Sequence, residues 1–484
     1  MTSNIQEIIQ HIQNKVLKII EMTTGESALA MTAYDAEKGV LGELLALGAS
    51  FMSLYYQTRS AEFAVETATR EDGAELPFHS WKRRQQTTIF GDVEIERSYF
   101  YESGQGGYFP MDRAVNLPTS LYSDVVQEIY AELAVEQAYR SGNDFMQRWL
   151  NLSISARAVQ EVVKASGAAV VPFYEQIEPP PVEAEATVLV AQADGKGVPL
   201  IINTEVSKAV RPKRGQARSR KKEAIVTTVH TQQVYKRSAD EVLASLFGQD
   251  SAQEENRPRS QPVCHKMIWA TLAGKETALN RLQAAVQKRE HDGLLYRVAL
   301  CDGAEALQKQ MQEKLPDFTL ILDFIHAYEY LWKAANALFS EDDPQRLSWV
   351  KVQTRCLLSG QTQTVIDHLR QRAKASDKPA SLSQKLQQVA GYFERNLAFM
   401  IYDRCLQLGW PIASGVIEGA CRHIVKDRME LSGMRWSQDG AEQLLRLRCT
   451  RHNNHWDAFW RYRRLQRLQP VANTAVVSSL PLVA

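Results

Sequence analysis

Four short runs of apolar and β-branched residues follow a proline-rich break, and their order constrains the fold more than any other feature of the sequence. The break is the triplet Pro179–Pro181, which cannot continue a helix and favours an extended linker. The runs after it are TVLVAQADG, EAIVTTVHTQ, YRVALCDG and FTLILDF, and a helix-like stretch, AEALQKQMQEKL, lies between the last two. Strands that alternate with helices predict an α/β domain rather than a β-sandwich.

The region before the break is mainly helical in pattern. Apolar residues recur at three and four positions from Ile5 to Tyr56, and helical patterns resume over 120–166. Between them, residues 87–101 alternate apolar and polar side chains about a Gly-Asp turn, which predicts a β-hairpin. The segment near 142–166 has the outline of a helix-turn-helix, which either reads DNA or is simply a pair of packed helices.

These patterns predict the following division of the chain. Residues 1–178 form a helical N-terminal region with the hairpin and the helix-turn-helix-like segment, for which we expect a DNA-binding role. Residues 184–330 form the first part of the α/β domain, 331–410 a helical insertion, and 411–450 a helix that completes the domain. Residues 451–484 are expected to be a loosely attached tail.

Composition excludes few classes of function. The chain has 57 Lys and Arg against 56 Asp and Glu, so only local patches can indicate a polyanionic partner. The six cysteines are scattered without a CxxC pair, so neither a disulfide framework nor a zinc knuckle is predicted. The N-terminal segment lacks the apolar run of a signal peptide, and no stretch approaches the roughly 20 apolar residues of a membrane span. We therefore expect a cytoplasmic protein without a membrane partner.

Two of the predicted strands end in Asp-Gly. Asp194 closes the run VLVAQADG, and Asp302 closes YRVALCDG. The carboxyl ends of strands are where α/β sheets collect ligands and catalytic groups, and the glycine lets a second group approach closely. Each pair alone also fits an ordinary Asp-Gly turn. Two such pairs together favour a shared site.

Asp323 and His326 lie where the last predicted strand gives way to a helix, in LILDFIHAYEYLW. A spacing of three places both side chains on one face of the first helical turn. Two interpretations stay open. Asp323 caps the helix while His326 packs, or both residues act directly in the site.

Glu418 lies in the first turn of another predicted helix, SGVIEGACRHIVKDRMEL. Arg422 and Lys426 follow at one-turn intervals, an arrangement that is also typical of a solvated helix face. Basic and aromatic residues continue into the next loop, and positive charge combined with an indole is typical of a nucleic-acid groove. The residues predicted to contact DNA in this region are Arg422, Lys426, Arg428, Arg435 and Trp436.

Two carboxylates at strand ends and one on a later helix suit phosphoryl transfer with two metal ions. Such a site shares oxygen ligands between two Mg²⁺ or Mn²⁺ ions held about 3.5–4 Å apart. Hard oxygen ligands select these ions over zinc. The same chemistry serves attack by water and attack by a DNA 3′-hydroxyl. We therefore expect Asp194, Asp302 and Glu418 to be both metal ligands and catalytic residues.

A second concentration of positive charge, RPKRGQARSRKK, spans 211–222 between the first two predicted strands. An isolated basic run is often only a solvated loop. Here it follows the strand that carries Asp194, which favours sequence-independent contact with DNA phosphates. The residues predicted to make this contact are Arg218, Arg220, Lys221 and Lys222.

In this order the motifs resemble those of bacterial insertion-sequence transposases of the Kra group, which are relatives of the Mutator-like transposases. The resemblance covers residues 89–451 and is carried by ADG, KKEA, CDGAEAL, DFIH and the run GVIEGACRHIVKDRMELSGMRWSQDGAEQLLRLR. It implies a ribonuclease H-like catalytic core of the DDE type, with a helical insertion before the third acid. By motif position the acids are Asp194, Asp302 and Glu418, while Asp323 and His326 match an Asp/Cys-x-x-His element near the site.

The resemblance also implies partners and alternatives. Such enzymes cut at the terminal inverted repeats of their element and join the freed ends to target DNA with Mg²⁺ or Mn²⁺, and pairing two ends implies at least a homodimer. Relatives often carry cysteines after the N-terminal hairpin, where this chain reads YFYESGQGGYFPMD, which puts zinc binding there in doubt. Two alternatives remain, a metal-dependent nuclease that does not join DNA, and a non-catalytic derivative that only occupies DNA.

Overall fold

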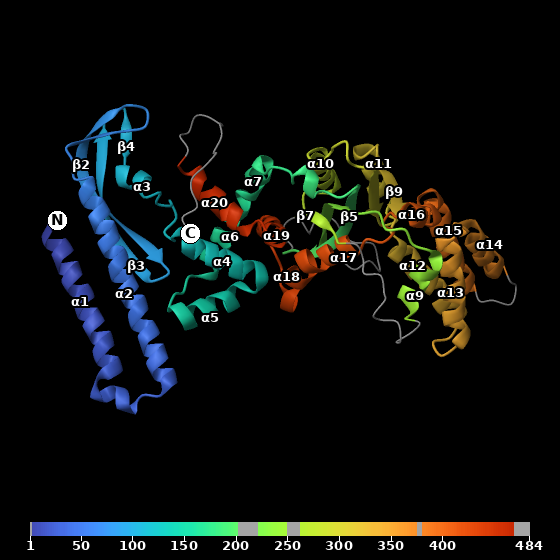
Figure 1. Cartoon of the computed structure of the whole chain (residues 1–484), viewed down its shortest axis with the longest axis horizontal. Coiled ribbons are helices and arrows are strands. Elements are labelled where there is room, and N and C mark those ends of the chain that lie inside the picture. The colour runs from blue at the N-terminus through green and yellow to red at the C-terminus, as the bar shows by residue number, and fades with distance from the viewer. Residues whose placement is uncertain (1, 202–220, 249–261, 375–379, 469–484) are drawn as a thin grey trace, which may run out of the picture. The chain divides into compact units, whose positions relative to one another are not determined.

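The computed structural model describes residues 2–201, 221–248, 262–374 and 380–468 (Figure 1). The chain divides into two compact units. The first comprises Met1–Phe173 together with His455–Ala484, and the second comprises Tyr174–Asn454.

The first unit opens with two long helices, α1 (Thr2–Thr24) and α2 (Ala33–Glu62), joined by the 3₁₀ turn η1 (Glu26–Ala30). They pack against each other, and the ion pair between Lys18 and Glu43 links them at 2.6 Å. A four-stranded antiparallel sheet follows. Its strands, in order, are β1 (Thr67–Thr69), β2 (Glu75–Thr88), β3 (Gly91–Glu102) and β4 (Gly106–Tyr108).

The expected hairpin is present, but it is longer and turns elsewhere than the pattern predicts. Strands β2 and β3 pair from Phe78 to Thr88, so the first arm begins well before residue 87. Thr88 pairs with Gly91, which places the turn at Ile89 and Phe90 rather than at the Gly-Asp step. The polar first arm, with several charged residues and glutamines, hid its strand character from an alternation count.

Helices complete the first unit. They are α3 (Pro110–Ala114), α4 (Asp124–Glu136), α5 (Tyr139–Leu150), α6 (Ala156–Ala168), α7 (Val170–Gln176) and α20 (Trp456–Gln466). Helices α5 and α6 match the predicted helix-turn-helix outline, with Asn151 in the left-handed region at φ 51° and Ser155 capping α6. Its role in reading DNA remains a prediction.

Helix α20 corrects the expectation that residues 451–484 form only a loose tail. The run WDAFW places Trp456, Phe459 and Trp460 on one helical face, and all three are buried. Arg467 forms an ion pair with Asp124 in the same unit. From His455 on, the described part of the predicted tail is therefore packed into the first unit, whereas residues 451–454 belong to the second.

The second unit is built on a five-stranded mixed sheet. Its strands are β5 (Val188–Pro199), β6 (Lys221–Gln232), β7 (Cys264–Thr271), β8 (Tyr296–Cys301) and β9 (Thr319–Leu322). The order across the sheet is β7-β6-β5-β8-β9; the first three strands are antiparallel neighbours, and β8 and β9 run parallel to β5. This is the arrangement of a ribonuclease H-like core, so the predicted fold class is confirmed.

Helices cover both faces of this sheet. One face packs on α10 (Lys275–Gln287) and α11 (Glu305–Lys314) through residues such as Leu189 and Ala191. The opposite face packs on a helical block through Val188 and Val190. That block contains α9 (Ala239–Phe247), α12 (Phe324–Leu338), α13 (Pro344–Leu358), α14 (Thr362–Ala373), α15 (Ala380–Asn396), η4 (Leu397–Phe399) and α16 (Tyr402–Leu408).

The chain returns from the helical block to the sheet through a broken helix. Its parts are α17 (Gly415–Ala420), the π-helical turn η5 (Cys421–Lys426), α18 (Asp427–Met429) and η6 (Leu431–Gly433), followed by α19 (Gln438–His452). Both α17 and η5 contact β5, and α19 packs on β7. The predicted helix near 411–450 therefore joins the sheet, although in several pieces. The 3₁₀ turn η2 (Val182–Ala184) precedes β5.

Candidate active site

Asp194 and Asp302 lie side by side on two neighbouring parallel strands. Asp302 directly follows β8, as predicted, but Asp194 does not end its strand, because β5 continues to Pro199 in its pairing with β6. Strands β5 and β8 are in register up to the pair of Ala193 with Cys301, and each aspartate is the next residue. Adjacent strands lie about 4.8 Å apart. The register thus brings together two residues that are more than a hundred positions apart in the sequence.

Glu418 reaches the same region on helix α17. The thiol of Cys421, three residues further along the same helical segment, donates to Oδ2 of Asp194 at 3.4 Å. Residues three apart on a helix lie on one face. The contact between Cys421 and Asp194 therefore holds the helix that carries Glu418 against β5.

The three predicted acids are electrostatically coupled. Burial raises the pKa of Asp302, and the negative charges of Asp194 and Glu223 raise it further. Partial burial also raises the pKa of Glu418, with added repulsion from Asp323, Glu329 and Asp194, and His326 opposes this shift. Within the described residues, no Lys or Arg forms an ion pair with any of the three acids.

The chemistry of the donor set fits a hard divalent cation, although the side chains are not arranged around one. Across the described part of the chain, no group of three His, Cys, Asp or Glu side chains is placed to hold a metal ion. Carboxylates that repel one another and lack a basic partner are the usual ligands of Mg²⁺. Sharing an ion would therefore require rotation of the acid side chains, which lie within β5, directly after β8 and in the first turn of a helix.

Asp323 is a buried structural link as well as a helix cap. Its Oδ1 accepts hydrogen bonds from the backbone N–H of Ile325 at 2.9 Å and of Ser414 at 3.3 Å. Its Oδ2 accepts the hydroxyl hydrogen of Ser414. Ser414 is the residue before α17, and its carbonyl oxygen accepts the N–H of Glu418. The geometry matches the capping interpretation and adds a tie to the helix that carries Glu418.

His326 lies beside these acids in a half-exposed position. Its Nε2 is 3.9 Å from Oδ2 of Asp323, and its Nδ1 is 3.8 Å from Oε2 of Glu329. Both neighbours are acidic, and Glu418 also feels the charge of His326. The predicted near-site pair of Asp323 and His326 is thus brought next to the acids, on the side of Glu418.

Tyr392 is a residue of this region that the sequence reasoning missed. It stacks on Tyr330 with ring centroids 3.6 Å apart, and its pKa is raised by burial and by the charges of Asp302 and Asp323. A Cβ on Gly303 would lie only 2.4 Å from its ring. The glycine after Asp302 therefore leaves room for a ring from the helical insertion. The only sequence signal for this close approach was the glycine in CDG.

The predicted phosphate-binding run is only partly described. Arg218 and Arg220 lie outside the described residues. Lys221 and Lys222 begin strand β6, and Lys221 forms an ion pair with Glu430. The two lysines therefore lie on the strand next to the one that carries Asp194.

The basic residues after Glu418 separate into an exposed and a buried group. Arg422, Lys426 and Arg435 are exposed, as contact with DNA requires. Arg428 and Trp436 are buried, with exposed fractions of 1% and 8%. The guanidinium of Arg428 lies 4.9 Å from the centre of the Trp436 ring, and Trp436 donates from Nε1 to the carbonyl of Met429. The predicted DNA contact of these two residues is wrong for this fold, because both pack inside the second unit.

The π-helical turn also corrects the expected strip of Glu418, Arg422 and Lys426. A π turn places one extra residue in the helical repeat, so one-turn spacing no longer keeps side chains in line. Arg422 instead lies 3.7 Å from Asp427. Such single π turns occur often at functional sites, and this one directly follows the helix that carries Glu418.

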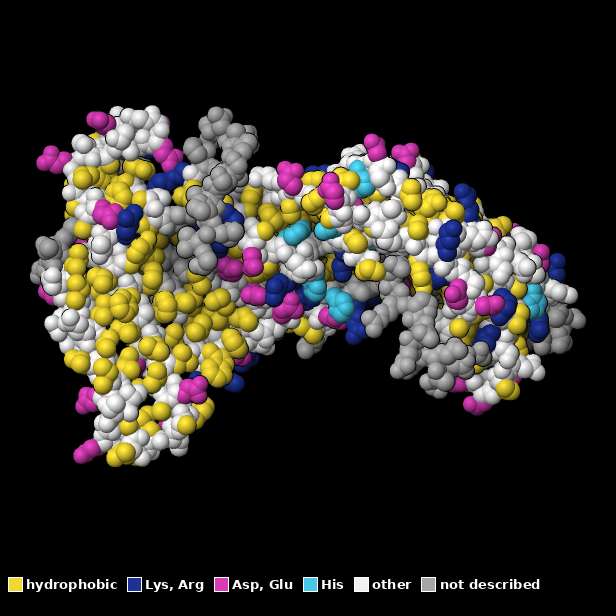
Figure 2. Space-filling view, viewed as in Figure 1, with side chains coloured by type: hydrophobic (Ala, Val, Ile, Leu, Met, Phe, Trp, Pro, Cys, Tyr) yellow, Lys and Arg dark blue, Asp and Glu magenta, His cyan; other side chains and the backbone are white. Residues whose placement is uncertain are grey.

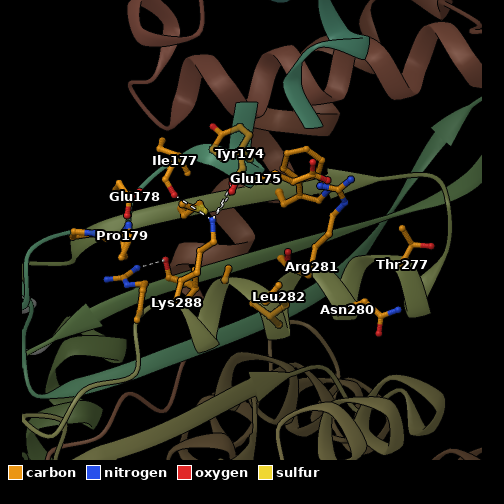
Figure 3. Close-up of a pocket in the computed structure, with 18 residues that line it drawn as sticks. Tyr174, Glu175, Ile177, Glu178, Pro179, Thr277, Asn280, Arg281, Leu282 and Lys288 are labelled. Atoms are coloured by element: carbon orange, nitrogen blue, oxygen red, sulfur yellow. Dashed lines mark hydrogen bonds between the residues drawn. The ribbon is translucent and has the colours of Figure 1, made fainter. Parts of the chain in front are cut away.

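A cavity of about 470 Å³ lies in the second unit away from these acids, between the segment 174–180, α10 and strands β6 and β7 (Figure 3). Lys288 donates from Nζ to three backbone carbonyls of that segment. The guanidinium of Arg281 lies 4.3 Å from the centre of the Trp269 ring. None of the three predicted acids lines this cavity.

The strand order and the position of the acids define this chain as a mixed α/β protein with a ribonuclease H-like core. No protein-family model matches the chain, and no curated protein matches its sequence. Among solved structures it is similar to the Drosophila P element transposase strand transfer complex, at 9% identity and a TM-score of 0.25, over 73% of this chain and 83% of that chain. At this TM-score the similarity carries no information on activity. The Kra-group resemblance remains a prediction.

Proposed function

We propose that this protein is a DNA transposase of the DDE type, which cuts the ends of a bacterial mobile element and joins them to target DNA in the cytoplasm. The observation that carries the proposal is the placement of Asp302 at the carboxyl end of β8 beside Asp194 on β5, with the Glu418 helix held against Asp194 by Cys421. Carboxyl ends of parallel strands are where α/β sheets place catalytic groups. The specific activity, cutting and joining of DNA ends, is inferred from the order of the sequence motifs.

The acids and their neighbours have separate roles in this proposal. Asp194, Asp302 and Glu418 would hold two divalent cations, which supply activation of the attacking oxygen and stabilisation of the leaving oxygen when bound. Burial, and after it repulsion from neighbouring acids, raises the pKa of Asp302 and of Glu418, and a bound cation would relieve both effects. Asp323 acts as a positioning residue, because it holds Ser414 at the start of the Glu418 helix.

DNA would approach this edge of the sheet along exposed basic side chains. Arg422, Lys426 and Arg435 are exposed on the segment that follows Glu418, and Lys222 lies on β6 beside Lys221. Lys and Arg contacts to phosphates bind DNA of any sequence and fix its position on the protein. Recognition of the terminal repeats is assigned to the helices α5 and α6 of the first unit.

The test is a joining reaction with purified full-length protein. DNA flanking the gene is first searched for imperfect inverted repeats, and a duplex with one such end and a free 3′-hydroxyl is incubated with a supercoiled plasmid and Mg²⁺. Plasmid covalently joined to the duplex is the expected product. Nicked or linear plasmid without joining would indicate a nuclease, and DNA binding without any broken strand would indicate a non-catalytic protein; either result overturns the proposal.

A further inference from the structure

The helical hairpin of α1 and α2 has an apolar surface that nothing in the described first unit covers. Among its described residues, only Ile12, Ser50, Tyr56 and Ser60 are buried. Large apolar side chains remain exposed on both helices, and Figure 2 shows hydrophobic side chains gathered over them. The exposed members include Val16, Leu17, Ile20, Leu44, Phe51 and Tyr55. The pairing of the two helices with each other therefore leaves most of their apolar side chains unburied.

The exposed stripe on α2 is apolar and uncharged. Leu44, Phe51 and Tyr55 are spaced by seven and four residues, which aligns them on one helix face, and their exposed fractions are 49%, 50% and 45%. From Leu44 to Thr58 the helix carries no charged residue. On α1, Leu17 is 62% exposed. Contiguous exposed apolar patches of this kind mark interaction sites.

Contacts within the unit border this stripe. Lys15 and Lys18 of α1 bond to the carbonyl of Ala46 and the carboxylate of Glu43. Gly48 lies on the same side of α2 as the stripe and faces the ring of Phe90 at the tip of the β-hairpin, where an added Cβ would lie only 2.4 Å from the ring. The three stripe residues remain about half-exposed beside this contact.

We propose that this face pairs with the same face of a second copy of the chain, so that two helical hairpins form a four-helix bundle. A two-fold axis brings one surface against itself, and an uncharged stripe meets no like charge when it does so. The exposed aromatic side chains on it are of the type that anchors protein interfaces. The proposal stands on this surface alone and goes beyond the proposed activity.

The available area is sufficient for a stable dimer. At 1.5 Å per residue, helices of 23 and 30 residues are about 35 and 45 Å long, and two helices side by side are about 20 Å wide. Pairing along the whole hairpin would cover a face of about 35 Å by 20 Å on each copy. The two faces together would bury about 1,400 Å², within the range of about 1,200–2,000 Å² for specific protein complexes.

A membrane fits this surface less well than a second copy does. By length and composition alone, α2 is the one helix among the described residues that could cross a bilayer. Its uncharged run over 44–58 is only about 22 Å long, against about 30 Å of hydrocarbon. Glu43, paired with Lys18, limits the run at one end, and the hairpin tip at Phe90 packs on its middle. Insertion of α2 into lipid would also bury the charged pair and the hairpin tip.

The experiment is sedimentation analysis of the full chain without DNA or metal, over a range of micromolar concentrations. The wild type is expected to be a dimer, and Phe51→Glu with Tyr55→Glu is expected to weaken the dimer about 100-fold. Leu295→Glu is the control, because Leu295 is also an exposed apolar residue, at 62%, but lies in the second unit. Circular dichroism and thermal unfolding check that each variant is folded. The experiment contains no DNA or metal, so a monomeric result does not bear on the proposed joining of DNA. A failed joining reaction likewise does not bear on the dimer.

If the charged variant does not fold, Phe51→Ser with Tyr55→Ser removes apolar area without adding charge and is expected to weaken the dimer about tenfold. A monomeric wild type, or a folded double variant that dimerises like the wild type, overturns the proposal. A monomer that floats with vesicles of phosphatidylcholine and phosphatidylglycerol also overturns it and identifies the face as a lipid-binding surface.

Discussion

The carboxylate of Asp323 accepts the hydroxyl hydrogen of Ser414, a residue 91 positions later in the chain, and both side chains are buried. This bond joins the start of α12 to the start of α17 across the helical insertion. Because the carbonyl of Ser414 accepts the N–H of Glu418 at 2.9 Å, the bond also fixes the first turn of the helix that carries Glu418.

Ser414→Ala therefore tests whether Asp323 acts through position. Loss of a hydroxyl bonded to a buried carboxylate is expected to lower the free energy of unfolding by about 1–3 kcal/mol. It is also expected to slow DNA cleavage about tenfold while leaving the dissociation constant for DNA unchanged. Ser238→Ala is the control, since Ser238 caps α9 in the same unit. Equal losses of stability and activity in both variants would show that Ser414 acts only through overall stability.

Neutralising any one of the three acids is expected to abolish most strand cleavage. Asp194→Asn, Asp302→Asn and Glu418→Gln should each reduce strand cleavage at least 100-fold, because each is proposed to hold a cation needed for the reaction. Binding to DNA, measured by fluorescence anisotropy, should be retained or tightened since negative charge is removed. Glu223→Gln is the control, an acid that raises the pKa of Asp302 but pairs with Lys275. Near-normal cleavage by any of the three variants removes that residue from the proposed site.

Gly303 and Gly391 provide a matched pair for the approach of Tyr392. A Cβ at position 303 would lie 2.4 Å from the Tyr392 ring, whereas a Cβ at 391, the residue before Tyr392 in α15, meets nothing within 4 Å. Gly303→Ala is expected to destabilise by about 1–3 kcal/mol through overpacking. Gly391→Ala is expected to stabilise by up to about 1 kcal/mol through helix propensity. Chemical denaturation measures both, and similar effects from the two would contradict the packing described here.

The raised pKa of Asp302 predicts a pH-dependent effect of Asp302→Asn on metal-free protein. A carboxyl whose pKa is higher in the folded state contributes stability below its ordinary value of 3.8, and this stability is lost as the pH rises through the folded value. At neutral pH the charged Asp302 therefore opposes folding, and Asn should raise the melting temperature by on the order of 2 °C. The gain should vanish near pH 3. A melting temperature lowered at pH 7, in the presence of a chelator, would refute this explanation.

The exposed and buried basic residues should respond differently to substitution. Arg435→Ala and Lys222→Ala should each weaken binding to all DNA sequences and reduce the salt slope by about one. Trp436→Ala should instead cost about 3 kcal/mol or more of stability, because the ring is buried. Titrations of DNA at several salt concentrations, together with denaturation curves, separate the two groups. A folded Trp436→Ala protein with wild-type stability and weakened DNA binding would restore the original prediction for that residue.

The sequence predicted the sheet better than it predicted the surfaces of the helices. Strand-forming runs and the Asp-Gly pairs were local signals, and they placed Asp302 correctly at the end of β8. The same signal was wrong for Asp194, because β5 runs on to Pro199. The adjacency of those two residues depends on the β5–β8 pairing, which a linear pattern does not contain. The family resemblance was needed to select Glu418 as the third acid.

Burial after Glu418 could not be predicted because it depends on tertiary packing. In the sequence, Arg428 looks like a continuation of the basic residues Arg422 and Lys426, yet it lies in the core beside Trp436. The bond between Ser414 and Asp323 and the approach of Tyr392 to Gly303 could not be predicted for another reason. Each contact joins segments that are far apart in the sequence, and no local pattern marks such partners.

The most direct test of the account is a calorimetric titration of Mn²⁺ into the full-length protein near neutral pH. The wild type is expected to bind two ions, and Asp194→Asn, Asp302→Asn and Glu418→Gln should each weaken binding by at least about 10- to 100-fold, while Glu223→Gln binds as the wild type does. Binding that survives in all three acid variants, or a wild type that takes up no Mn²⁺, would contradict the claim that these carboxylates form one site.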